Sequence, residues 1–168
     1  MKTGNIVLGI LFAAATAVSA THAMAANAPK PVNAKKLDAL ATTALETMKQ
    51  KAAELKIQGV AVVSYAQGDA IEGWTSKMAV VGHMTDPKAS EKGNNLLGIA
   101  YAKSAEMAST LQDSGTAKRP PMTGEFGWQG GVILQVKGGY IIVAFSGGKS
   151  EDDVQVSKAG LEAMKKGF

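Results

Sequence analysis

Two pairs of β-rich segments, each joined by a short glycine-containing turn, constrain the fold of this chain more than any other feature. The first pair covers residues near 59–66 and 70–81, with a Gly-Asp turn at 68–69. The second pair reads GVILQV and YIIVAF, joined by Lys-Gly-Gly at 137–139. β-Branched and aromatic residues favour strands, and glycine allows the tight turns between them. Because neither pair has a crossover helix between its strands, the sequence predicts an antiparallel sheet.

Three segments with apolar residues at spacings of three and four predict amphipathic helices. The first follows Asn33, a typical N-cap, the second follows the Asn pair at 94–95 and ends at Gly115, and the third starts at Ser150. The residues expected to face the core are Leu37, Leu40, Ala41, Ala44, Leu45, Met48, Ala52 and Leu55 in the first helix, Leu97, Ala100, Ser104, Ala108 and Leu111 in the second, and Val154, Ser157, Leu161 and Met164 in the third.

The order of the elements is helix, strand, strand, helix, loop, strand, strand, helix. Hairpins combined with three helices predict an α+β domain, in which helices flank an antiparallel sheet of about five strands. The loop at 116–131 is rich in proline and glycine, and its length favours a functional or mobile segment. Phe126 and Trp128 within it could flank a flat ligand or anchor the loop to its own domain.

The N-terminal segment has the layout of a secretory signal peptide. A single lysine near the start precedes an apolar run from about Ile6 to Val18, and small residues follow. The run is too short to cross a bilayer as a helix, so an N-terminal membrane anchor is the less favoured interpretation. We expect cleavage after Ala25, and the alternative positions are Ala20, Ala23 and Ala26.

Removal of residues 1–25 would leave a flexible lead-in at 26–34 and a single domain at 35–168. The mature protein is then expected in the periplasm or outside the cell, without stable insertion into a membrane. The sequence has no cysteine, which excludes disulfides, thiolate nucleophiles, Cys-ligated zinc and covalent haem attachment. The net charge of +4 falls to +3 without Lys2, and the dispersed lysines form no basic patch, so nucleic acid is not an expected partner.

The stretch FSGGKSEDD at 145–153 resembles the end of a phosphate-binding loop but lacks its beginning. Such a loop needs a glycine four residues before the Gly-Lys-Ser triplet, and that position is Val143. The three acids at 151–153 would also repel a polyphosphate at the start of the third helix. We therefore expect no bound nucleotide.

The same stretch predicts a sharp corner between the last strand and the last helix. Gly147 and Gly148 are expected to supply backbone angles that other residues resist. Ser150 and Asp153 are spaced as a capping box, and the acids complement the helix dipole.

The C-terminal segment GGVILQVKGGYIIVAFSGGKSEDDVQVSKAGLEAM resembles the signature of the GlcG/HbpS family. GVAVVSYAQG and AYAKSAEMAST also resemble the family's first strand and its lysine-containing helix, and the resemblance covers about residues 35–166. Departures are Ile133 at a usual proline and the lack of an arginine after the second strand. The residues that match in the C-terminal segment are Ser146, Gly147, Gly148, Glu151, Asp153, Ala159, Gly160 and Leu161.

The resemblance implies a profilin-like three-layer sandwich that assembles into homo-oligomers. Family members include haem-binding and haem-sensing proteins, some of them exported and acting with a sensor kinase. The resemblance therefore implies an exported small-ligand-binding or sensing protein, with haem as the leading ligand and a sensor protein as a partner.

His83 and Met84 are the candidate ligands of a haem iron. Imidazole and thioether groups both bind haem iron, and neighbours on a strand point to opposite faces, so only one of the two could reach it. We prefer His83, which is the only histidine left after removal of the signal peptide. Tyr65, Tyr101 and Tyr140 are alternatives if an oxygen ligand is used.

Other residues could contact the rest of the ligand. Lys103, Lys118 and Arg119 could pair with haem propionates. The backbone of Ser146–Gly148 could line a pocket or an oligomer contact, or could only turn the chain.

Two other classes of function remain open. An enzyme could combine His83, Ser146 and an aspartate into a hydrolytic triad, but no spacing in the sequence supports it. A structural or interaction protein would use the sheet or a helix as its contact surface and would need no ligand.

Overall fold

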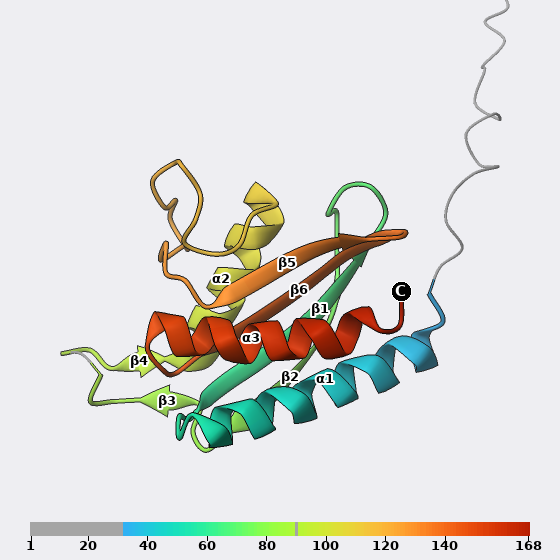
Figure 1. Cartoon of the computed structure of the whole chain (residues 1–168). Coiled ribbons are helices and arrows are strands. Elements are labelled where there is room, and N and C mark those ends of the chain that lie inside the picture. Colours follow the sequence, from blue (N-terminus) through green and yellow to red (C-terminus); the bar gives the residue numbers. More distant parts are fainter. Residues whose placement is uncertain (1–31, 90) are drawn as a thin grey trace, which may run out of the picture.

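The computed structural model describes residues 32–89 and 91–168 (Figure 1). The predicted signal peptide at 1–25 and most of the predicted lead-in at 26–34 lie outside the described residues. Within the described part, no helix combines the length and apolar character needed to span a bilayer.

Helix α1, Ala34–Glu54, begins where the sequence predicts. The side chain of Asn33 accepts hydrogen bonds from the backbone N–H groups of Lys35 and Lys36, as expected of an N-cap. The predicted apolar stripe faces the sheet, and its fully buried members are Ala41, Ala44, Leu45, Met48 and Ala52. This helix is confirmed.

The main sheet has four antiparallel strands in the order β2-β1-β6-β5. Their bounds are β1 (Gly59–Gln67), β2 (Thr75–Val81), β5 (Gly131–Val136) and β6 (Gly139–Ser146). Both predicted hairpins are present, and the central strands β1 and β6 also pair with each other. Strand β2 starts later than predicted because residues 68–74 form a loop rather than a two-residue turn.

A separate two-stranded ribbon lies beside the main sheet. It consists of β3 (Thr85–Asp86) and β4 (Asn94–Asn95). The prediction of about five strands in one sheet therefore resolves, within the described residues, into four strands plus this ribbon. The ribbon leads directly into helix α2.

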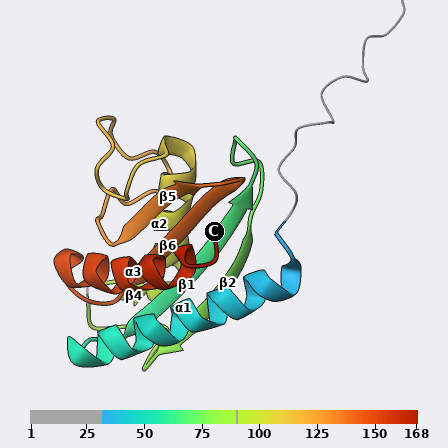
Figure 2. The ribbon, with the colours of Figure 1, turned by 45° about the vertical axis from the view of Figure 1, so that its right-hand side comes forward.

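Helices cover both faces of the sheet (Figures 1 and 2). Helices α1 and α3 (Ser150–Lys165) pack on one face, and α2 (Leu96–Thr110) packs on the other. Alternate residues of the central strands point to the two cores, as strand geometry requires. Buried residues include Met48, Val63, Val143, Phe145 and Met164 in the α1–α3 core, and Val60, Val62, Ala100, Met107 and Ile142 on the α2 side. The predicted α+β sandwich is confirmed.

Helix α2 ends at Thr110 rather than at the predicted stop, Gly115. Leu111 is the C-cap and adopts the left-handed conformation, with a φ of 54°. Its side chain is 50% exposed, so the prediction that it faces the core is wrong. The inner face of α2 is rotated relative to the prediction because two charged side chains are buried on it. The buried residues of α2 are Leu96, Ile99, Ala100, Lys103, Ser104, Glu106 and Met107.

The predicted capping box at the start of α3 is also wrong. The N-cap is Lys149, which makes no side-chain capping bond, and Ser150 is the first helical residue. Asp153 points inward and is only 3% exposed. Its inner-face companions are Val156, Ser157, Gly160, Ala163 and Met164, whereas the predicted Val154 and Leu161 are only half-buried.

Candidate functional site

A pocket of about 170 Å³ opens at the corner where β6 leaves the sheet and α3 begins. We call it the corner pocket. Four parts of the chain meet around it: the β3–β4 ribbon, helix α2, the loop before β5, and the corner itself. The lining residues that matter below are Asp86, Asn94, Lys103, Trp128, Gln129, Ser146, Gly147, Gly148 and Asp153. The pocket therefore brings together four of the predicted site residues: Lys103, Ser146, Gly147 and Gly148.

A buried ion pair forms part of the pocket wall. Lys103 Nζ lies 2.8 Å from Asp153 Oδ2 and donates a second bond, also 2.8 Å long, to the carbonyl oxygen of Phe145. The two side chains are 3% and 4% exposed. Burial lowers the pKa of Lys103 and raises the pKa of Asp153, while the charge of each partner acts in the opposite direction on the other. The pair is a fixed polar feature of the site.

The corner itself depends on close backbone packing at Gly147. This residue has a φ of 154°, and a Cβ there would overlap the carbonyl oxygen of Gln58. Gly148 does not have a positive φ, so only one of the two glycines supplies the predicted special angle. The backbone N–H of Gly148 instead donates to Asp153 Oδ1 at 2.8 Å. The Ser146–Gly148 backbone thus both turns the chain and lines the pocket.

Two aromatic side chains stand at the rim of the pocket. Trp128 lines the pocket and packs against Phe126, with ring centroids 4.9 Å apart. Their side chains remain 46% and 45% exposed. The two rings are tilted by 33° to each other, and the exposed pair offers an apolar surface beside a polar pocket.

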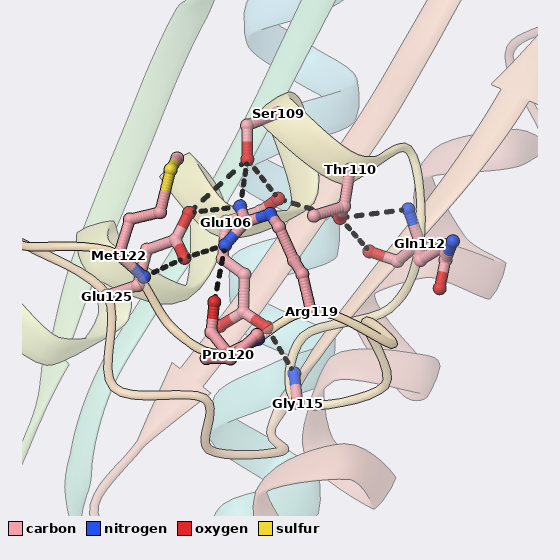
Figure 3. Close-up of polar contacts among 9 residues, drawn as sticks. All are labelled: Glu106, Ser109, Thr110, Gln112, Gly115, Arg119, Pro120, Met122 and Glu125. Atoms are coloured by element: carbon pink, nitrogen blue, oxygen red, sulfur yellow. Dashed lines mark hydrogen bonds and ion pairs between the residues drawn. The ribbon is translucent and has the colours of Figure 1, made fainter.

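Arg119 lies away from the pocket, in a polar network that holds the loop to α2 (Figure 3). Its guanidinium forms two bonds to Glu125, Nη1 to Oε2 at 2.6 Å and Nη2 to Oε1 at 2.7 Å. It also donates to Ser109 Oγ on α2 at 3.0 Å. This bidentate pair lowers the pKa of Glu125 to about 2, chiefly through the hydrogen bonds from Arg119. Arg119 therefore positions the loop that carries Trp128.

His83 and Met84 lie in the segment between β2 and the ribbon, and neither lines the corner pocket. Both are exposed, Met84 by 41%. The Nδ1 atom of His83 is 2.7 Å from Gln58 Oε1, and the carbonyl oxygen of Met84 accepts a bond from Leu96 N at 3.0 Å. The segment therefore adjoins the ribbon that contributes Asp86 to the pocket.

The remaining predicted contacts lie elsewhere. Lys118 is exposed and does not line the corner pocket. Tyr65 and Tyr140 are buried and donate to the carbonyl oxygens of Gly138 and Asp69, and burial raises the pKa of Tyr65. Tyr101 OH is 3.0 Å from Ser76 Oγ. None of the three tyrosines lines the corner pocket.

Sequence reasoning missed two acids of the site. The sequence pattern predicts a capping role for Asp153, although this residue begins the inner stripe that continues through Val156, Ser157 and Gly160. That i, i+3, i+4, i+7 spacing is a signal that could have placed it inside. Asp86 lies on a two-residue strand, for which a sequence carries no periodic signal.

Comparison with known proteins shows a shared fold. The chain is similar to the protein in the crystal structure of a PduOC:heme complex, with a TM-score of 0.52 and 18% sequence identity. The match covers 79% of this chain and 94% of that chain. The two proteins share an architecture. No family model and no curated protein matches this sequence.

The corner pocket does not fit a whole porphyrin. Pockets that enclose drug-sized ligands have volumes of about 300–1,000 Å³, and this one has about 170 Å³. The described residues that line it include no imidazole, thioether or phenol, and the ammonium of Lys103 is already paired. A haem would therefore contact the rim of this pocket rather than its interior, and its iron ligand would come from another segment.

Proposed function

We propose that this chain is an exported small-ligand-binding or sensing protein and that haem is its leading ligand. The observation that carries the proposal is the meeting of Lys103 and the Ser146–Gly148 backbone around one pocket with an aromatic rim. The fold it shares with a protein crystallised with haem supports the choice of ligand.

In this proposal, the haem ring and the haem iron contact different segments of the chain. The exposed Trp128–Phe126 pair provides an apolar surface for the ring, and the pocket beside it is too small to hold that ring. We propose His83 or Met84 as the iron ligand, because both are exposed beside the ribbon. The imidazole or the thioether, whichever binds, would then help to set the electronic state of the iron.

A hemin titration of the mature protein tests this proposal. We expect a shifted Soret band in the wild type that is lost in His83→Ala or in Met84→Leu, according to which residue binds the iron. Met122→Leu is the matched control, because Met122 is an exposed methionine outside the pocket lining. The absence of any Soret shift rejects haem, whereas a shift unchanged in both variants rejects only these two ligands.

We further propose a homo-oligomeric state and a sensor protein as partner. Both proposals rest on the resemblance of the C-terminal segment. Light scattering tests the first, since a monomer at micromolar concentration contradicts it. Fractionation of expressing cells tests export, since retention of the unprocessed chain in the cytoplasm contradicts a cleaved signal peptide.

A further inference from the structure

We propose that the corner pocket binds a small neutral molecule with carbonyl and hydroxyl oxygens, at a site separate from any haem on the rim. The inference rests on the proposal that the protein binds a small ligand, but it does not depend on haem being that ligand. Three features carry it: the size of the pocket, an unused buried donor, and the charge of its walls.

The volume of the pocket sets the size of the molecule. At about 170 Å³ the pocket is well below the roughly 300–1,000 Å³ of sites that enclose drug-sized ligands, so only a molecule of a few non-hydrogen atoms fits inside it. Such a ligand is about the size of a three-carbon hydroxy compound. A nucleotide, a sugar phosphate or a porphyrin is far larger.

Lys103 offers the pocket a hydrogen-bond donor. An ammonium group has three N–H donors, and two of them go to Asp153 and to the carbonyl oxygen of Phe145. Among the described residues no acceptor takes the third. Because Lys103 lines the pocket and is only 3% exposed, a ligand oxygen there would satisfy a donor that bulk water reaches poorly.

The charge of the walls selects against an anion. The charged residues that line the pocket are one lysine and two aspartates, Asp86 and Asp153, so the formal charge is −1. Next to the lining, Glu151 and Asp152 in the first turn of α3 add two negative charges and Lys88 and Lys149 add two positive ones, so the local balance stays negative. These negative charges would repel a carboxylate. A neutral carbonyl oxygen can accept a hydrogen bond from Lys103 without that repulsion.

The same walls disfavour a cation at the buried end. A cation beside Lys103 would meet a like charge and leave the third N–H without an acceptor. Asp86 provides the complementary group on the ribbon side, because Lys88 N at 3.0 Å is the one described donor bonded to its carboxylate. A ligand hydroxyl could donate to it, and Trp128 could cover the carbon atoms of the ligand.

The test uses three molecules of equal size and different charge: lactamide, lactate and alaninamide. Each is titrated into the labelled mature protein while amide resonances are followed by NMR. We expect neutral lactamide to shift the amides of Gln129, Gly147 and Gly148 at millimolar concentration, and both anionic lactate and cationic alaninamide to bind at least about fivefold more weakly. Tighter binding of lactate, or shifts confined to other surfaces, overturns the assignment.

Variants separate the pocket from the rest of the surface. Ala89→Leu and Ser150→Leu each place a larger side chain in the pocket lining and are expected to abolish the shifts. Ala70→Leu, in the exposed loop outside the pocket lining, is the matched control and should bind as the wild type does. Asp86→Asn removes one negative charge and should improve lactate binding relative to lactamide. Lactamide binding that survives both leucine variants overturns the proposal. The hemin titration is a separate experiment read from the Soret band, so its failure is distinguishable from a failure of lactamide binding.

Discussion

Lys103 on α2 and Asp153 on α3 form an ion pair 2.8 Å long between helices that lie on opposite faces of the sheet. The pair lies beside the end of β6, where Lys103 also donates a hydrogen bond to the carbonyl oxygen of Phe145. Asp153 in turn accepts a bond from Gly148 at the corner. One buried pair therefore connects both helical layers, the last strand and the wall of the corner pocket.

Breaking this pair on one side should destabilise the fold strongly. Lys103→Met or Asp153→Leu leaves a buried polar partner without its counterpart, and we expect each to lower the free energy of unfolding by about 3–5 kcal/mol. The double variant Lys103→Met with Asp153→Leu should recover most of that loss, because no buried charge remains. Urea unfolding of the four proteins measures the cycle.

The control for this cycle is the exposed pair Lys77–Asp38, whose side chains are 39% and 68% exposed. Its disruption should cost less than about 1 kcal/mol. Equal losses at the two pairs would contradict the structural role assigned to Lys103 and Asp153.

A methyl group at Gly147 should disrupt the corner. Gly147→Ala would place Cβ against the carbonyl oxygen of Gln58 and the Cα of Gly59, both of them backbone atoms that cannot rotate away. We expect a loss of more than about 3 kcal/mol in the free energy of unfolding, together with altered amide resonances around the pocket. Gly73→Ala is the control, because no atom lies within 4 Å of its added Cβ, and it should be neutral or stabilising by up to about 1 kcal/mol. Equal stability of the two variants would mean that the corner packs more loosely than described.

The elements with strong periodic patterns could be predicted from the sequence. Asn33 and the stripe from Leu37 to Leu55 define α1 because a cap and eight regularly spaced apolar residues agree. The hairpins followed from β-branched runs with glycine between them. These patterns are local, and in natural sequences the local preferences usually agree with the final fold.

The site was less predictable because it depends on contacts between distant residues. Lys103 can be buried because it forms an ion pair with Asp153, which lies fifty positions later in the chain. No local sequence pattern indicates that contact. The prediction for Leu111 is wrong because Lys103 and Glu106 occupy the inner face of α2, which apolar residues usually take. The corner pocket likewise needs the ribbon, whose strands are too short to carry a pattern.

The Arg119–Glu125 pair should make stability depend on pH in the acid range. The pKa of Glu125 falls from 4.5 to about 2 in the folded protein, so the unfolded chain takes up a proton first as the pH drops. The contribution of the pair is fully present above about pH 4.5 and is lost as the pH falls towards 2. Urea midpoints between pH 5 and pH 2.5 should decline less steeply in Arg119→Gln than in the wild type. Lys165→Gln, at the exposed Lys165–Glu162 pair, should decline as the wild type does, and parallel curves for all three proteins would contradict the assignment.

Trp128 should report on any ligand that reaches the rim of the pocket. The chain has two tryptophans, so Trp74→Phe leaves Trp128 as a single fluorescent probe. Hemin binding at the rim should quench its emission, because the ring would lie against the exposed indole.

The variant Trp128→Ala should weaken hemin binding roughly three- to tenfold through loss of aromatic contact. It should change the free energy of unfolding by less than about 1 kcal/mol, since the side chain is 46% exposed. Trp74→Ala is the matched control, because Trp74 is 37% exposed and does not line the corner pocket. Equal weakening of hemin binding by the two alanine variants would contradict the placement of the haem ring against Trp128.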